Sequence, residues 1–241
     1  MDKYALYAQR LGDTTLVLAQ RYCQLVGWAP TLEEEIALAN IGLDYLGQGT
    51  AWLDLAARRE GKGRTADDLA YFRDEREYTN YLLAELENGD FAQTTLRGYL
   101  FSLYFSALYQ ALAESADEDF RAIAAKSLKE VDYHARHERE WLIRLAHGTA
   151  ESRKRLENAW EFLWPYTEEL FEALEEGLPD MAAIRAQWRS GIEALAKECE
   201  LAIPDNVYFQ RGGTEGRHTE KLGLLLAEMQ SLRRAYPGAS W

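Results

Sequence analysis

The stretch that decides the fold is residues 30–63, PTLEEEIALANIGLDYLGQGTAWLDLAARREGKG. Thr31 is a helix-capping residue, and Glu34 stands at the reciprocal position of a capping box. The helix can run to Glu60 before Gly61 and Gly63 end it, so the pattern predicts one helix of roughly 45 Å. A helix of this length is typical of helical bundles. Large apolar residues recur along it at helical spacing: Leu32, Ile36, Leu43, Leu46 and Leu53.

The rest of the chain is also helical in pattern, because no segment alternates apolar and polar residues for long enough to predict a strand. We therefore expect one all-α domain over residues 1–241, built on a bundle of long helices. Pro165 is expected to kink the helix that contains it. Further helices are expected at about 2–26, 91–114, 117–148, 151–176, 179–204 and 218–235, with one or two shorter ones within 65–90.

Composition argues against several classes of partner. The chain has 40 acidic residues against 27 Lys and Arg, whereas nucleic acids and anionic membranes attract basic proteins. No run approaches the roughly 18 apolar residues of a membrane span, and the N-terminus lacks the apolar core of a signal peptide. We expect a cytoplasmic protein with no nucleic-acid or membrane partner. Cys23 and Cys199 are interpreted as two buried free thiols, with one disulfide as the alternative.

The stretch KEVDYHARHE, residues 129–138, raises the question of a metal site. Di-iron bundles take Glu-x-x-His from each of two helices and one Glu from each of two others, because residues three apart share a helix face. Here Val131 stands three residues before His134, and valine cannot bind a metal. Glu130, His134 and His137 remain as an alternative site for zinc or another ion. We favour the plainer interpretation of an exposed His pair.

The other half of a di-iron site is also missing. Residues 42–49, GLDYLGQG, place Tyr45 and Gln48 where Glu and His would stand. The expected helix at 91–114 has no acidic residue before its last position, and the interior of the first helix has only Asp13. We therefore expect ordinary core here and assign this chain no catalytic, cofactor-binding or metal-binding residue. The vacated ligand positions are Tyr45, Gln48, Val131 and His134.

Long, distinct strings carry a resemblance to a known family over essentially the whole chain. They are RLGDTTLVLAQR (10–21), LANIGLDYLGQ (38–48), FRDERE (72–77), KSLKEVDYHARH (126–137) and GGTEGRHTEKLGLLLAEMQ (212–230). Through them the chain resembles the family of structural C subunits of the bacterial 1,2-phenylacetyl-CoA epoxidases. These are multicomponent monooxygenases of aerobic phenylacetate degradation.

The resemblance implies a ferritin-like fold and a non-catalytic role beside the di-iron catalytic A subunit. A Glu-x-x-His motif of that catalytic partner stands in the region that matches Tyr45 to Gln48. The resemblance also implies other small subunits and a reductase that carries FAD and an iron–sulfur centre and uses NADPH, while this chain holds no cofactor of its own. A homodimer of the isolated chain is a further expectation.

A glycine-rich segment at 212–216 lies among four cationic side chains in an otherwise acidic protein. Its spacing is neither a P-loop nor a dinucleotide fingerprint, so a structural turn is the favoured interpretation. The alternative is that the segment docks the catalytic partner or lies near its CoA-binding edge, because helix N-termini and positive charge suit anions. The candidates for such a contact are Arg211, Arg217, His218 and Lys221.

Three hypotheses for the function therefore stand side by side. The favoured one is a structural subunit of a multicomponent oxygenase. The second is an active metalloenzyme that uses Glu130, His134 and His137. The third is an unrelated helical scaffold or regulatory protein. The first predicts no stoichiometric iron and co-purification with a larger di-iron subunit, the second predicts metal and activity in the isolated chain, and the third predicts neither.

Overall fold

The computed structural model describes residues 2–173, 178–205 and 207–239. Within these ranges the chain forms ten α-helices, four short 3₁₀-helices and no strand, which confirms the all-α prediction. The chain divides into two compact units, a first unit of residues 1–87 with 211–241 and a second unit of residues 88–210. The expectation of a single domain stays a prediction.

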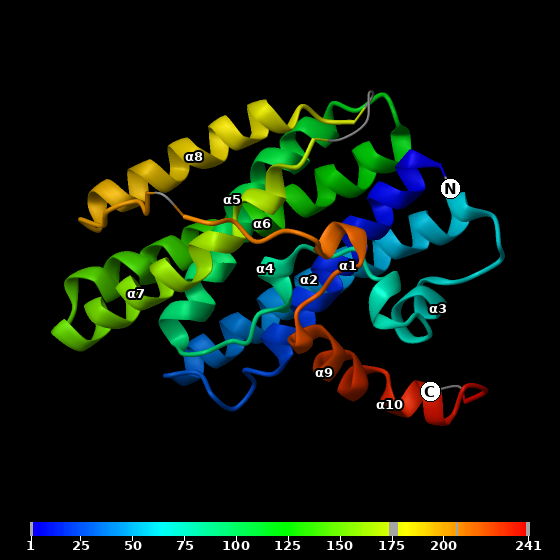
Figure 1. Cartoon of the computed structure of the whole chain (residues 1–241), viewed down its shortest axis with the longest axis horizontal. Coiled ribbons are helices and arrows are strands. Elements are labelled where there is room, and N and C mark those ends of the chain that lie inside the picture. The colour runs from blue at the N-terminus through cyan, green and yellow to red at the C-terminus, as the bar shows by residue number, and fades with distance from the viewer. Residues whose placement is uncertain (1, 174–177, 206, 240–241) are drawn as a thin grey trace. The chain divides into compact units, whose positions relative to one another are not determined.

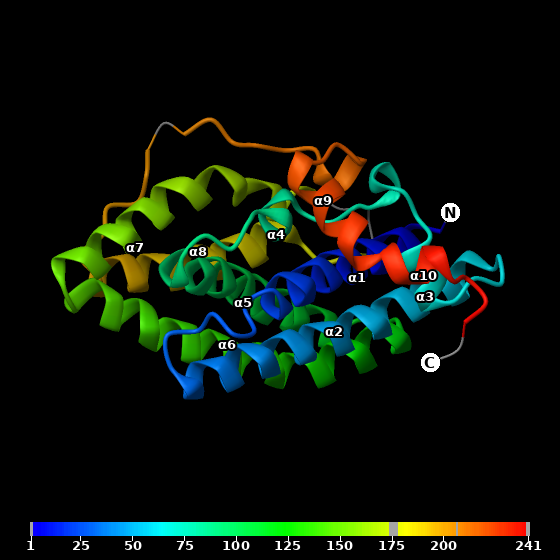
Figure 2. The same cartoon turned by 90° about the horizontal axis from the view of Figure 1, so that it is seen from below.

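The first unit is built on α1 (Lys3–Cys23) and α2 (Leu32–Glu60), two long helices that pack against each other (Figure 1, Figure 2). Thr31 caps α2 as predicted, because its hydroxyl accepts the backbone N–H of Glu34 at 3.4 Å. Gly61 ends the helix in the left-handed conformation, also where the sequence predicts. The other elements are α3 (Ala66–Tyr71), η1 (Glu75–Glu77), α4 (Leu82–Glu85), η4 (Gly213–Glu215), α9 (Glu220–Met229) and α10 (Ser231–Ala235).

Glycines let α1 and α2 approach each other closely. A Cβ atom on Gly12 of α1 would lie 2.7 Å from the side chain of Leu53. A Cβ atom on Gly49 of α2 would lie 3.1 Å from the backbone nitrogen of Leu16. The first distance is shorter than van der Waals contact allows, so the packing of the two helices depends on the missing side chain of Gly12.

We expect Gly12→Ala to lower the free energy of unfolding by about 1–3 kcal/mol, because overpacking outweighs the gain in helix propensity. Gly47 of α2 is the matched control, since no described atom beyond its own helix lies within 4 Å of where its Cβ would stand. Gly47→Ala should raise the free energy of unfolding by about 0.5–1 kcal/mol. Thermal unfolding measures both changes. A Gly12→Ala protein as stable as the Gly47→Ala protein would contradict the close approach.

The second unit contains another pair of long packed helices and two shorter ones: α5 (Phe91–Ala113), α6 (Glu118–His147), α7 (Ala150–Leu163) and α8 (Met181–Glu198). A row of aromatic rings runs along the buried side of α5. Phe105 stacks between Phe101, at 5.7 Å between ring centroids, and Tyr109, at 5.3 Å. Trp188 of α8 donates its indole N–H to the carbonyl of Leu100 at 2.9 Å and so ties α8 to α5.

Two predicted helices are interrupted in the structure. The helix expected at 151–176 ends at Leu163, and Pro165 lies in the 3₁₀-helix η2 (Trp164–Tyr166) instead of kinking a continuous helix. Proline has no N–H to continue the α-helical ladder, which explains the stop. A second 3₁₀-helix, η3 (Glu168–Phe171), follows, while the expected end near residue 176 lies outside the described residues. The last predicted helix divides into α9 and α10.

The two cysteines are only partly as expected. Both are free thiols in the structure, as the favoured interpretation has it. Cys199 is buried, but Cys23 is exposed at the end of α1, so the expectation of two buried thiols is wrong for Cys23.

Each unit supplies two long helices, and a ferritin-like bundle, which the resemblance implies, is built on four such helices. The α1–α2 pair and the α5–α6 pair both pack along their shared length. No helix in the described ranges combines the length and the hydropathy that crossing a bilayer requires.

Candidate functional site

The expected ligand positions on α2 are buried but hold no metal-binding pair. Tyr45 is fully buried and Gln48 is 3% exposed. The ring of Tyr45 stacks on Tyr22 of α1, with centroids 5.8 Å apart. Neither side chain offers a carboxylate that would bridge two metal ions.

On α6, the positions that match the other motif are also buried. Val131 and His134 are both inaccessible to solvent, so the expectation of an exposed His pair is wrong for His134. One turn further on, the buried carboxylate of Glu138 accepts a hydrogen bond from the hydroxyl of Ser102 on α5 at 2.7 Å. This hydrogen bond links α5 to α6, the two long helices of the second unit.

The alternative metal site does not gather into one cluster. Glu130 and His137 are half-buried, whereas His134 is fully buried. The ring of His137 stacks on Tyr133, with centroids 6.2 Å apart. Over the described part of the chain, no group of three or more His, Cys, Asp or Glu side chains is arranged to hold a metal ion. A di-iron centre does not fit the donors that these residues offer.

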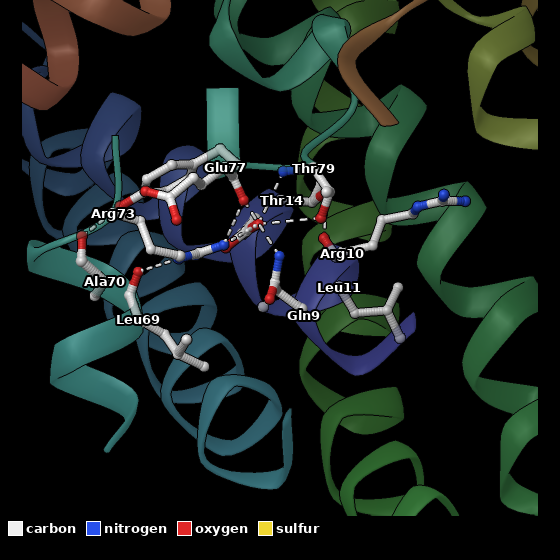
Figure 3. A network of polar contacts seen from close by, with 12 residues as sticks. Gln9, Arg10, Leu11, Thr14, Leu69, Ala70, Arg73, Glu77 and Thr79 are labelled. Carbon is white, nitrogen blue, oxygen red and sulfur yellow. Dashed lines mark hydrogen bonds and ion pairs between the residues drawn. The ribbon is translucent and has the colours of Figure 1, made fainter. Parts of the chain in front are cut away.

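A buried polar cluster in the first unit surrounds Asp13 of α1, whose side chain is fully buried. Figure 3 shows residues of this cluster, among them Arg73, Glu77 and Thr79. Arg73 faces its carboxylate with both terminal guanidinium nitrogens, one of them 3.0 Å from Oδ2. Thr79 donates its backbone N–H at 2.9 Å and its hydroxyl at 3.1 Å to the same carboxylate. Arg73 also donates to the carbonyl oxygens of Leu69 at 2.5 Å and Glu77 at 2.9 Å. The cluster therefore ties α1 to the irregular chain between α3 and α4.

The C-terminal segment joins this cluster through Gln230. Its side-chain amide nitrogen lies 3.1 Å from the carbonyl oxygens of Ala70 and Arg73 and from the hydroxyl of Tyr78. Burial and the charge of Asp13 raise the pKa of Tyr78 well above its usual value, so the phenol stays neutral. These bonds fix Gln230 at the junction of α9 and α10, where the predicted helix is interrupted.

A second buried cluster joins α4 to the segment before α9. The side chains of Glu85 and His218 are both fully buried, with His218 Nδ1 2.8 Å from the carboxylate and Nε2 2.9 Å from the carbonyl of Tyr78. Glu85 also accepts the side-chain amide of Asn80 at 3.0 Å and the backbone N–H of Thr219 at 2.5 Å. Since both ring nitrogens face acceptors, the geometry favours the imidazolium form.

The pKa of His218 agrees with this geometry. Burial alone would lower it, but the hydrogen bond and the charge of Glu85 together with the carbonyl of Tyr78 raise it above its ordinary value. The pair is therefore an ion pair whose two members lie 133 residues apart in the sequence.

The four cationic candidates of the C-terminal segment have different environments. The His218 side chain points into the core, so it is not placed to touch a partner or CoA directly. Arg217 is exposed and lies 2.5 Å from the exposed carboxylate of Glu215. Lys221 lies 3.3 Å from each of two carboxylates, and Arg211 is exposed. A docking role for Arg211, Arg217 and Lys221 stays a prediction.

Comparison with known proteins places the chain among its relatives. Residues 2–241 match the family described as "Phenylacetic acid catabolic protein". The chain belongs to this family. It is also 44% identical, over an alignment of 249 residues that covers all of both chains, to a protein of Escherichia coli (strain K12) described as the C subunit of 1,2-phenylacetyl-CoA epoxidase. The resemblance drawn from the sequence strings is thereby confirmed.

In this member of the phenylacetic acid catabolic protein family, three of the resembling strings meet in the buried clusters. Asp13 belongs to RLGDTTLVLAQR and Arg73 to FRDERE, while both His218 and Gln230 belong to GGTEGRHTEKLGLLLAEMQ. The structure brings these segments together within the first unit. The segments that show the family resemblance therefore also contain residues whose buried contacts stabilise the fold.

Sequence reasoning did not predict either cluster. One signal for the first was present, because Asp13 is the single acid inside a largely apolar helix. A charge in such a helix must find a partner once it is buried. The sequence did not identify Arg73 as that partner, and nothing local marked Glu85 as the partner of His218.

Proposed function

We propose that this chain is a non-catalytic structural subunit of a phenylacetyl-CoA epoxidase. In this role it pairs with and stabilises the di-iron catalytic subunit during aerobic phenylacetate degradation. Full-length similarity to a protein described as a subunit of this epoxidase supports the assignment to the complex. The observation that carries the non-catalytic role is the buried pair Tyr45 and Gln48 on α2, with Val131 on α6. These residues stand where the di-iron pattern requires carboxylates and imidazoles.

The residues themselves explain what such a structural protein contributes. Without ligand carboxylates on its inner face, α2 has no cluster of like charges to desolvate at these positions. Instead the stacked rings of Tyr22 and Tyr45 hold α1 and α2 together. A rigid helical partner of this kind stabilises the shape of a neighbouring catalytic protein, while the oxygen chemistry takes place in that neighbour.

In this proposal the cofactors lie in the partners. The di-iron centre belongs to the catalytic subunit, and electrons arrive from NADPH through a reductase with FAD and an iron–sulfur centre. Other small subunits complete the assembly, which works in the cytoplasm.

Metal analysis tests the proposal. We expect near-zero iron and zinc per chain when this protein is purified alone from iron-rich cells, and no epoxidation when it is mixed with the reductase alone. Addition of the di-iron catalytic subunit should supply both the iron and the activity. The measurements are elemental mass spectrometry and product formation from phenylacetyl-CoA.

Two variants make the result decisive. His134→Ala removes the buried imidazole of α6, and Glu130→Gln is a milder change at a half-buried position that should preserve folding. Neither should alter the metal content if the proposal is correct. One or two metal ions per chain, lost in both variants, would establish a working site around His134 and overturn the non-catalytic role.

A further inference from the structure

The first unit displays a group of large apolar side chains on its surface between residues 26 and 43. Five of them are more than half exposed, although such residues are normally buried. They define what we call the α2 outer surface: Val26 (59% exposed), Trp28 (83%), Leu32 (72%), Ile36 (55%) and Leu43 (60%).

Helix α2 is apolar on two opposite sides. Leu32, Ile36 and Leu43 are four and seven residues apart, a spacing that puts them on one helix face. The inner face packs in the core and includes the fully buried Tyr45 and Trp52. A helix at the surface of a protein that works alone normally turns a polar side to water. The outer apolar side of α2 therefore indicates a surface that a partner covers.

The loop that carries Trp28 is held in place. The carboxylate of Glu35 on α2 accepts the backbone N–H groups of Gly27 and, at 3.2 Å, of Ala29. These bonds flank Trp28 on both sides, and the capping bond of Thr31 fixes the start of the helix beyond it. An exposed Trp on a pinned loop loses little conformational freedom on binding, and Trp is the residue type most typical of interface hot spots.

The segment that carries the α2 outer surface has charged residues of one sign only. Residues 23–57 contain five acids and no Lys, Arg or His. Two copies of this surface placed face to face would bring acidic side chains together, in a chain whose net charge is already −13. The complementary occupant is therefore a different protein, with an apolar helical face and Lys or Arg at its rim.

We infer that the α2 outer surface is where the catalytic subunit of the epoxidase docks, with Trp28 as the anchor and the acids beside it contacting basic side chains of that partner. The inference rests on the proposed function, because its partner is the catalytic subunit. It goes further by naming the face of this chain that binds.

The test is binding of the iron-loaded catalytic subunit, measured by isothermal titration calorimetry with the full-length chain. Trp28→Ala should raise the Kd by at least about 30-fold, and Ile36→Gln by about 5- to 10-fold. Tyr208→Ala is the matched control, because Tyr208 is also 83% exposed but belongs to the second unit. It should leave the Kd unchanged.

A charge variant tests the acidic rim separately. Glu33 is exposed in the first turn of α2, and Glu33→Gln should slow association at low salt while losing its effect at high salt. Glu161→Gln, at an exposed position of α7, is its control. Thermal unfolding of each variant verifies that it is folded.

The possible outcomes distinguish a failure of the proposed docking surface from a failure of the proposed function. If the wild-type chain binds the catalytic subunit, but the Trp28→Ala and Ile36→Gln chains bind it as tightly, the docking surface is overturned and the proposed function stands. If the wild-type chain shows no binding to the catalytic subunit, both are overturned. If Trp28→Ala instead abolishes a dimer of the chain alone in light scattering, the surface joins two copies of this chain and the inference is wrong.

Discussion

Replacing Asp13 by Asn is expected to lower the free energy of unfolding by about 3–5 kcal/mol, because the change leaves Arg73 charged and buried without a counter-ion. Arg73 is 3% exposed and Asp13 is fully buried, so water does not replace the lost charge. Asn keeps the shape of the side chain, and Thr79 keeps a carbonyl oxygen to bond. The loss of stability therefore measures the effect of removing the charge and not the effect of creating a cavity. Urea unfolding at neutral pH, followed by far-UV circular dichroism, measures it.

The controls come from the same unit. Asp54→Asn breaks the ion pair with Arg58, whose partners are 3.0 Å apart but more than half exposed, and should change stability by no more than about 1 kcal/mol. The double variant Asp13→Leu with Arg73→Met removes both charges and should recover much of the loss. An Asp13→Asn protein as stable as the Asp54→Asn protein would show that the buried pair does not hold the first unit together.

The sequence predicts that the helices exist, but it does not predict which face of each helix is buried. Capping at Thr31 and the stop at Gly61 are local signals, and the structure places both ends of α2 there. The apolar spacing through Leu32, Ile36 and Leu43 also predicts a helix correctly, yet these residues lie on its exposed side. In a helix that is apolar on two sides, apolar residues recur at the same helical spacing on the buried side and on the exposed side. The sequence therefore does not reveal which side meets the core.

The two buried clusters could not be predicted from the sequence for a different reason. Arg73 bonds to Asp13 across 60 residues of sequence, and His218 to Glu85 across 133. Such pairings follow from the path of the chain and leave no local pattern. The absence of metal ligands does not free this chain of buried charge. The first unit contains two buried ion pairs, and each has a desolvation cost that the pairing must offset. Of the candidate site, the sequence located the altered positions Tyr45, Gln48 and Val131 but not these pairs.

The second large effect concerns pH. Since the pKa of His218 is raised in the folded protein, the folded state holds its proton more tightly than the unfolded state, whose His pKa is about 6.5. The stability from the His218–Glu85 pair is therefore fully present below pH of about 6.5 and is lost as pH rises through the folded pKa. We expect His218→Gln to lower the free energy of unfolding by about 3 kcal/mol on the acidic side of this window, where it leaves the buried Glu85 carboxylate without its cation.

The same variant should matter less at alkaline pH, because the wild-type imidazole is then neutral and no longer compensates Glu85. Urea unfolding of both proteins at intervals across the window measures the narrowing gap in stability. His147→Gln is the control, since His147 is exposed at the end of α6 and its replacement should leave the pH profile of stability unchanged. A His218→Gln protein that is destabilised equally at every pH would mean that the pair acts through neutral hydrogen bonds and that His218 carries no proton-linked charge.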